Sequence, residues 1–336
     1  MPPAIQHPSR HVWDFWYHFD PQTRLFHLFY LNADRALVAS QQHHYAACVG
    51  HATTADFVTI DWGDQESIDV LRPPVNHWAN TCLWSGDVVA VKNGYLMAYT
   101  SRDGRQGDGL TQSIGMAYSR DLGSHRWQFF DTQIQPQAGY QTQGVAGDLT
   151  IHAWRDPYLF RHRPSRQIFM LASAKAVAGP PHQSGVVALL QIGDDQFAPA
   201  VRGQGDWAYL PPLAAPGCYG EMEVPQLYGR AVGGYELLFS CWSPYDFSPA
   251  TGGAGGLQGI AISDFTPLEG HSSEPTPPAP RPRVLMAERQ GLYACRVVPE
   301  LGGEIVGFDI AQGGIRRSGQ PTDLVALDRD FSDLVI

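Results

Sequence analysis

Residues 26–30 read Phe-His-Leu-Phe-Tyr, a short hydrophobic run of the kind that forms a buried β-strand. Similar runs return after about 67 to 73 residues, at 95–99, 168–172 and 235–239. Each run is followed about 20 residues later by a second predicted strand that begins with a glycine. These second strands begin at Gly50, Gly115, Gly185 and Gly259. A strand pair repeated at this period predicts equivalent units that pack side by side.

Such a unit matches one blade of a β-propeller, in which small antiparallel sheets are arranged radially and each covers the face of the next. After the four copies, residues 292–298 and 304–309 form two further predicted strands. The sequence therefore predicts an all-β protein, a five-bladed β-propeller. We expect it to form a single domain over residues 1–336, with a core of approximately 12–310 and no C-terminal β-sandwich. A β-sandwich or two unrelated β domains is the alternative.

The composition restricts the partners of the protein. A formal net charge of -10, with only 23 Lys and Arg residues, argues against binding to nucleic acid or an anionic membrane. No apolar run is long enough to span a bilayer, and the first residues lack the pattern of a secretory signal, so a cytoplasmic location is expected. The five cysteines lack zinc-site spacing, which favours buried free thiols. The oligomeric state is not indicated.

Acidic residues recur next to aromatic residues and glycines. The stretches are Val12-Trp13-Asp14-Phe15-Trp16, Trp84-Ser85-Gly86-Asp87, Trp154-Arg155-Asp156-Pro157 and Gly220-Glu221-Met222-Glu223-Val224-Pro225. Cleavage of a glycosidic bond requires one carboxylic acid to protonate the leaving oxygen and one carboxylate to attack the anomeric carbon or activate water. A further carboxylate can stabilise an oxocarbenium-like transition state. Together these motifs indicate a carbohydrate-cleaving site.

Each role has one candidate. Asp14, between aromatic residues that can stack on a sugar, is the predicted nucleophile. Glu223, flanked by apolar neighbours that can raise its pKa, is the predicted acid/base, and Glu221 competes with it for this role. Asp156 is the predicted transition-state stabiliser, with Arg155 placed to bind sugar hydroxyls or to separate the carboxylates.

This combination resembles the five-bladed β-propeller glycoside hydrolases that include invertases, fructanases and levansucrases, families 32 and 68, and more distantly family 43. Trp13-Asp14 is similar to the levansucrase W-D-[ST]-W, Arg155-Asp156-Pro157 to the family Arg-Asp-Pro, and Glu223-Val224-Pro225 to the invertase E-C-P. By this resemblance Asp14, Asp156 and Glu223 are nucleophile, stabiliser and acid/base.

Weaker similarities extend the resemblance over residues 12–310. His27-Leu28-Phe29-Tyr30 looks like the invertase H-L-F-Y-Q, Gly50-His51-Ala52-Thr53 like G-H-A-x-S, and Trp84-Ser85-Gly86 like W-S-G-S, whose residues line the fructose pocket. The chain also departs from the family: N-D-P-N-G is absent, and Asp87 stands where W-S-G-S ends in serine. The predicted substrate-binding residues are Trp13, Trp16, Trp84, Ser85, Asp87, Arg155 and Glu221.

The resemblance implies a retaining glycoside hydrolase that cleaves β-fructofuranosides, such as sucrose or short fructooligosaccharides, with transfer to a second sugar as a further outcome. This mechanism needs no metal or other cofactor, and His43, His44 and His152 show no metal-site spacing. Two alternatives remain open. One is an arabinofuranosidase or xylosidase of the family 43 type, and the other is a non-catalytic sugar-binding propeller.

Overall fold

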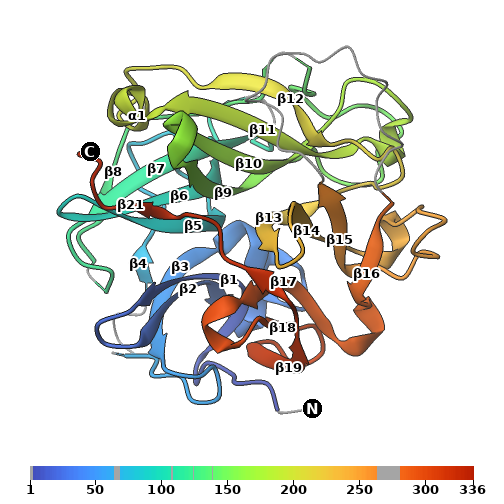
Figure 1. Cartoon of the computed structure of the whole chain (residues 1–336), viewed down its shortest axis with the longest axis horizontal. Helices are drawn as coiled ribbons and strands as arrows, with labels where there is room; N and C mark the ends of the chain where they lie inside the picture. The colour runs from blue at the N-terminus through green and yellow to red at the C-terminus, as the bar shows by residue number, and fades with distance from the viewer. Residues whose placement is uncertain (1–2, 64–68, 107–108, 124, 138, 263–280) are drawn as a thin grey trace.

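The computed structural model describes residues 3–63, 69–106, 109–123, 125–137, 139–262 and 281–336. Five antiparallel sheets surround a central axis, which confirms the predicted five-bladed β-propeller (Figure 1). No β-sandwich follows the fifth sheet within the described residues. None of the helices in this part of the chain is long and apolar enough to cross a membrane.

The sheets follow one another along the chain. The first contains β1 (Arg10–Asp20), β2 (Leu25–Asp34), β3 (Cys48–Thr54) and β4 (Asp69–Leu71). The second contains β5 (Leu83–Val91), β6 (Gly94–Arg102), β7 (Gln112–Ser119) and β8 (Gln128–Phe129). The third contains β9 (Trp154–His162), β10 (Gln167–Lys175), β11 (Gly185–Gly193) and β12 (Ala208–Ala214). The four hydrophobic runs predicted from the sequence lie in the second strands of four sheets, namely β2, β6, β10 and β14 (Tyr235–Cys241).

The fourth sheet contains β13 (Glu223–Arg230), β14 (Tyr235–Cys241), β15 (Gly256–Ile262) and β16 (Arg283–Met286). The fifth contains β17 (Leu292–Val298), β18 (Glu304–Asp309) and β19 (Ile315–Pro321). The α-helix of the described residues is α1 (Asp194–Val201). Short 3-10 turns are η1 (Arg35–Leu37), η2 (Gln42–Ala46), η3 (Arg163–Ser165), η4 (Pro181–Gln183), η5 (Ser243–Tyr245), η7 (Glu288–Gln290) and η8 (Pro299–Leu301).

The first strand of every sheet lies innermost, and these five strands form a closed ring. β1 contacts β5, β5 contacts β9, β9 contacts β13, β13 contacts β17, and β17 contacts β1. A separate hydrophobic cluster fills each of the five interfaces between neighbouring sheets. Burial of these faces is the main stabilising term, since each sheet is apolar on both sides.

Strand β2 shows why the predicted runs are almost continuously hydrophobic. Its side chains alternate between two interfaces, because successive residues of a strand point to opposite faces. Leu28 and Tyr30 pack against the fifth sheet, whereas Phe29 and Leu31 pack against the second. A strand buried on both sides has no solvated face, so polar alternation is absent.

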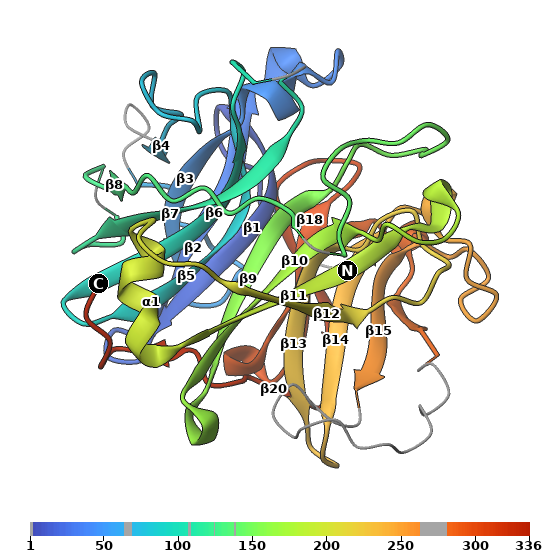
Figure 2. The ribbon, with the colours of Figure 1, turned by 90° about the horizontal axis from the view of Figure 1, so that it is seen from above.

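The C-terminal segment crosses the propeller instead of adding a strand to the fifth sheet. β20 (Leu324–Val325) pairs with the innermost strand β13, and β21 (Asp330–Phe331) pairs in parallel with the innermost strand β5. This segment ends beside α1 (Figures 1 and 2), where the rings of Phe197 and Phe331 are in contact. The segment therefore connects the fourth and second sheets across the ring.

Candidate active site

A β-bulge interrupts each innermost strand at the same end. The pairing register shifts between Val12 and Phe15, between Trp84 and Gly86, opposite the pair Leu171 and Ser173, between Glu223 and Gln226, and between Tyr293 and Arg296. A bulge adds one residue to a strand and re-aims its side chains. Five equivalent bulges around one axis therefore turn side chains from all five innermost strands toward a common space.

Three of the bulges contain a residue other than glycine with a positive φ angle. These residues are Asp156 at 61°, Val224 at 49° and Ala294 at 45°. A left-handed conformation costs on the order of 1–3 kcal/mol at such a position, so the surrounding fold must hold it in place. All five bulges have the same consequence for the site: the residue just before the bulged position lines one pocket. These lining residues are Trp13, Trp84, Arg155, Glu223 and Tyr293.

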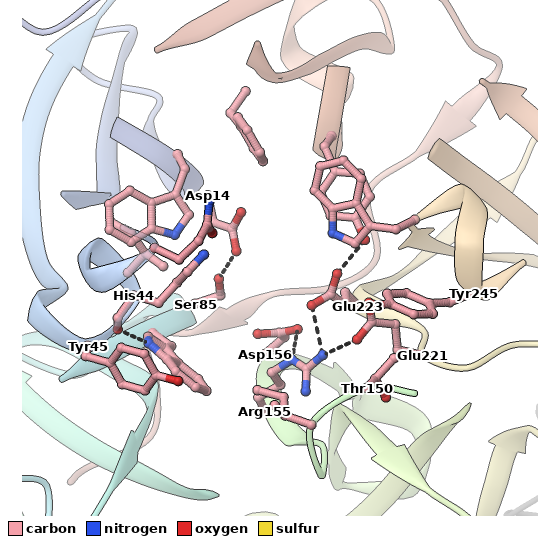
Figure 3. Close-up of a pocket in the computed structure, with 18 of the residues that line it drawn as sticks. Asp14, His44, Tyr45, Ser85, Thr150, Arg155, Asp156, Glu221, Glu223 and Tyr245 are labelled. Carbon is pink, nitrogen blue, oxygen red and sulfur yellow. Dashed lines mark hydrogen bonds and ion pairs between the residues drawn. The ribbon is translucent and has the colours of Figure 1, made fainter. Parts of the chain in front are cut away.

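The pocket on the propeller axis is a cavity of about 480 Å³. It brings together all three predicted catalytic residues, Asp14, Asp156 and Glu223, from three different blades. Figure 3 shows Asp14 and Glu223 on opposite sides of the pocket, with Asp156 and Arg155 between them. Five residues predicted to bind substrate also line it, namely Trp13, Trp84, Ser85, Arg155 and Glu221.

Arg155 connects the acidic residues. Its Nη2 donates hydrogen bonds of 2.8 Å to both Glu221 Oε2 and Glu223 Oε1. Its Nε lies 3.7 Å from Asp156 Oδ2. The buried Nη1 has no hydrogen-bond partner among the described residues, so it is available to a ligand in the pocket.

Asp14 is held by a single strong hydrogen bond. Ser85 Oγ donates to Asp14 Oδ2 at 2.5 Å. Burial raises the pKa of Asp14 to about 6, with Glu223 raising it further and the Ser85 hydroxyl opposing the shift. Asp14 is therefore mostly ionised at neutral pH and becomes protonated in mild acid.

The remaining carboxyl groups are also poorly solvated. Burial raises the pKa of Asp156 to about 7, although Arg155 opposes the shift, and its Oδ2 accepts a 3.0 Å hydrogen bond from the Val224 amide. Burial and the neighbouring Glu223 raise the pKa of Glu221. Glu223 Oε2 accepts a hydrogen bond from the Tyr293 hydroxyl. Titratable groups with such shifts, converging in one cavity, are typical of active sites.

Two residues predicted to bind substrate, Trp16 and Asp87, do not line the pocket. Trp16 is fully buried in the cluster between the first and second sheets. Asp87 is fully buried as well, where it accepts hydrogen bonds from the Leu159 amide and from Arg329 Nη2. The bulges at Asp14 and Ser85 explain both cases, because a bulge reverses the face to which the following residues point.

Several lining residues were not predicted as site residues. They include Gln41, His44, Tyr45, Leu149, Ile151, Trp242, Tyr245 and Tyr293. Tyr293 occupies the position equivalent to Trp13, Trp84, Arg155 and Glu223. Alignment of the repeats would therefore have predicted it as a lining residue. The others lie between strands, where the repeat gives no information.

The described part of the chain contains no group of three or more His, Cys, Asp or Glu side chains that could hold a metal ion. His43 and His44 lie close together, with ring centroids 3.9 Å apart, beside Trp13. Burial lowers the pKa of His44 to about 4, so its imidazole is neutral at physiological pH. His152, a buried loop residue, donates a 2.7 Å hydrogen bond from Nε2 to the Gln141 carbonyl.

One protein-family model matches part of the chain. The family model of the glycosyl hydrolases family 32 N-terminal domain matches residues 20–184, slightly less than half of the chain. A search of curated protein sequences finds no match. This match shows that part of the chain is similar to that domain, on a five-bladed β-propeller.

Several solved structures are similar to this chain in fold, at low sequence identity. Levansucrase of Bacillus subtilis is 13% identical with a TM-score of 0.64, covering 99% of this chain and 90% of its own. A fructofuranosidase of Schwanniomyces occidentalis complexed with fructosylnystose is 15% identical with a TM-score of 0.59, covering 96% of this chain and 57% of its own. An endo-arabinase of Bacteroides thetaiotaomicron is 13% identical with a TM-score of 0.56, covering 93% and 94%.

The resemblance to the invertase and levansucrase type of propeller is therefore confirmed: the family 32 N-terminal model matches residues 20–184, and the solved fructofuranosidase and levansucrase structures are similar in fold. The chain spans between 53% and 57% of the fructofuranosidase structures that it matches.

Proposed function

We propose that the protein is a retaining glycoside hydrolase that cleaves β-fructofuranosides, such as sucrose or short fructooligosaccharides, and that it can transfer the fructosyl group to a second sugar. One observation carries the proposal. Asp14 and Glu223 face each other across a pocket in which Asp156 and Arg155 lie between them. Two carboxyl groups on opposite sides of the scissile bond are the minimum that this chemistry needs.

In the proposed mechanism Asp14 is the nucleophile. Its carboxylate attacks the anomeric carbon of the fructosyl unit, while Glu223 donates a proton to the departing oxygen. Glu223 then removes a proton from water or from an acceptor hydroxyl, which attacks the fructosyl-enzyme and releases Asp14. The pKa of about 6 for Asp14 suits this role, because the carboxylate is ionised at neutral pH yet poorly solvated.

Arg155 and Tyr293 position the acid/base in this mechanism. Both side chains donate hydrogen bonds to Glu223. When Glu223 is protonated, one of its oxygens no longer accepts from these donors and can point toward the leaving group. The free Nη1 of Arg155 is placed to bind a sugar hydroxyl.

Asp156 is the proposed stabiliser of the transition state. It is fixed by the Val224 amide through Oδ2, and its own amide donates to Thr100 Oγ1 at 2.9 Å. The oxocarbenium-like transition state carries positive charge, which a pre-positioned carboxylate in a desolvated site stabilises more strongly than it would in water.

The matched structures support a carbohydrate substrate. The fructofuranosidase was solved with fructosyl-erythritol and with fructosylnystose, and the levansucrase with oligosaccharides. The endo-arabinase match, which covers nearly all of both chains, favours a second candidate function, cleavage of arabinofuranosides. Both sugars are furanosides, so the same three carboxyl groups can serve either reaction.

Product analysis separates these candidates. The purified protein would be incubated with sucrose, an inulin-type oligosaccharide, and nitrophenyl arabinofuranoside and xyloside, with Asp14→Asn as the control. Fructose released by the wild type and not by the variant is the expected result. With methanol as acceptor, retention predicts methyl β-fructofuranoside, detectable by NMR. Pentose release would support the second candidate, and inversion would contradict the nucleophile role of Asp14.

A further inference from the structure

The segment before β9 has an unusual distribution of polar and apolar residues. From residue 148 to residue 152 the side chains alternate, as in any extended segment. Asp148, Thr150 and His152 make hydrogen bonds to the protein, whereas Leu149 and Ile151 are 57% and 50% exposed. A solvated loop normally shows the opposite pattern, with apolar side chains inside. Leu149 and Ile151 both line the pocket described above.

A buried lysine holds this segment in place. Lys175, in β10, is fully buried and donates hydrogen bonds to Asp148 Oδ1 at 2.9 Å, Thr150 Oγ1 at 2.5 Å and the Gly220 carbonyl at 2.6 Å. Burying an ammonium group is costly unless it is fully hydrogen-bonded. These contacts fix the residues on either side of Leu149, so its exposure is a consequence of the fold and not of a loose loop.

The other side of the pocket mouth presents an exposed aromatic ring. Tyr45 is 47% exposed, and the guanidinium of Arg102 lies 4.9 Å from the centre of its ring. The same guanidinium lies 5.1 Å from the ring of Trp84, whose Nε1 donates to the His44 carbonyl at 2.7 Å. The polar atom of Trp84 is thus already paired, and its ring presents carbon to the cavity.

These three exposed residues, Tyr45, Leu149 and Ile151, define the outer rim of the pocket. Inside the rim lie the charged groups, of which Arg155, Asp156 and Glu221 are each 5% exposed. The pocket is therefore polar at its base, and its mouth carries Tyr45, Leu149 and Ile151 together with two exposed polar residues, Gln41 and His44. The Thr150 hydroxyl is already bonded to Lys175 and Asp148, so it is not available to the hydroxyls of a sugar leaving group.

We propose that the outer rim binds an apolar aglycone, so that the protein acts on β-fructofuranosides of alkyl or aryl alcohols in preference to those of a second sugar. The proposal rests on the proposed function, since the fructosyl unit would occupy the base of the pocket. Leu149 and Ile151 would cover the alkyl chain from one side and Tyr45 from the other. The leaving alcohol then gains binding energy from removal of apolar surface from water.

A homologous series of alkyl β-fructofuranosides tests this inference. Methyl, propyl, butyl and hexyl alcohols differ little as leaving groups, so the series varies mainly in apolar surface. We expect kcat/KM of the wild-type protein to rise about two- to fourfold per methylene until the chain passes the rim. The hexyl-to-methyl ratio of kcat/KM should fall about fivefold or more in Leu149→Ser or Ile151→Ser.

Val145→Ser is the matched control. Val145 lies on the same segment and is 38% exposed, but it does not line the pocket. The hexyl-to-methyl ratio should therefore be unchanged in this variant. A ratio reduced equally in Val145→Ser would show a general effect of the segment and overturn the assignment of the rim.

The outcomes are distinguishable from failure of the proposed function. Turnover of every member with no dependence on chain length would overturn the aglycone proposal alone. Release of fructose from sucrose without turnover of any alkyl fructoside would also overturn the aglycone proposal alone, whereas no turnover of sucrose or of any alkyl fructoside would overturn the proposed function and the aglycone proposal together. Analytical ultracentrifugation tests a further occupant of the rim. If the wild-type protein is a dimer and Leu149→Ser is a monomer, the rim binds a second copy of the chain, and the aglycone proposal is overturned.

Discussion

The two ends of the innermost strands differ sharply, although the same five strands form both. At the bulged end, the pocket gathers four carboxyl groups, three of which, those of Asp156, Glu221 and Glu223, lie against Arg155. At the other end a second cavity of about 610 Å³ is lined by tyrosines and arginines. There the C-terminal segment inserts Arg329, which pairs with the fully buried Asp87 and lies 4.8 Å from the ring of Tyr158.

This difference separates two uses of buried charge. The pocket end gathers like charges and left-handed backbone, both of which oppose folding. The opposite end matches an acid with a base and ties the second sheet to the chain terminus. Charges that destabilise the fold are retained where chemistry can use them, and paired charges are found where the ring is held together.

The largest expected effect lies at the pocket end. Asp14→Asn and Glu223→Gln should each lower kcat by about 10⁴-fold or more, because each removes a group that acts on the reacting atoms. Circular dichroism and thermal unfolding should show an intact fold. A loss of less than about tenfold in either variant would contradict its role. Asp87→Asn, in the middle of β5 and outside the pocket, is the matched carboxylate control and should retain activity.

Substitution of Asp87, which pairs with Arg329, should lower the free energy of unfolding instead of the activity. Asp87→Ala leaves the Arg329 guanidinium without its acid and the Leu159 amide without an acceptor. Removal of one partner of a buried ion pair typically costs about 3–5 kcal/mol, and partial exposure of Arg329 reduces this to about 2–3 kcal/mol. Urea unfolding would measure it. The double variant Asp87→Ala/Arg329→Met should recover part of the loss, and no recovery would argue against a direct pair.

The pH dependence of activity sharpens the same contrast. Asp14 and Asp156 both act as carboxylates, so kcat/KM should begin to fall below the pKa of Asp156, about 7, and should fall more steeply below the pKa of Asp14, about 6. The Ser85 hydroxyl favours the ionised form, and Ser85→Ala should therefore move this acid limb to higher pH. An acid limb near pH 4, or one unaffected by Ser85→Ala, would show that another group controls it.

Much of the fold was predictable because a strand buried on both sides leaves a plain sequence signal. The runs at 26–30 and 292–298 lie in β2 and β17, and the repeat period gave the number of blades. The position of the acidic motifs was also predictable, since each lies on or next to an innermost strand. Local sequence was sufficient to predict those features that follow from the repeat period and from short motifs.

Bulges and long-range contacts were not predictable in the same way. In a regular strand Trp16 would share a face with Asp14, and Asp87 with Ser85, so both were expected in the pocket. The bulges reverse that relation without leaving a sequence mark. The partner of Asp87 lies 242 positions away in Arg329, and nothing local indicates it. Leu149 and Ile151 depend on Lys175 in the following hairpin.

The smallest expected effect concerns the stability of the pocket end itself. The pKa of Asp14 is about 6 in the folded protein and near the ordinary value of 3.8 when unfolded. The folded state therefore holds this proton more tightly. The resulting stability is fully present below pH 3.8 and is lost as the pH rises through about 6, above which a poorly solvated charge remains.

Asp14→Asn removes that charge and should make the inactive protein more stable than the wild type at pH 8, by about 1–2 kcal/mol. At pH 4 the two proteins should unfold at nearly the same denaturant concentration, because Asp14 is then protonated in the folded wild type. Urea unfolding at both pH values measures the difference. Asp87→Asn should show the opposite sign at pH 8, since it weakens a matched pair. Equal stability of Asp14→Asn and wild type at pH 8 would mean that Asp14 is well solvated or well paired, and the contrast between the two strand ends would then not rest on unpaired charge.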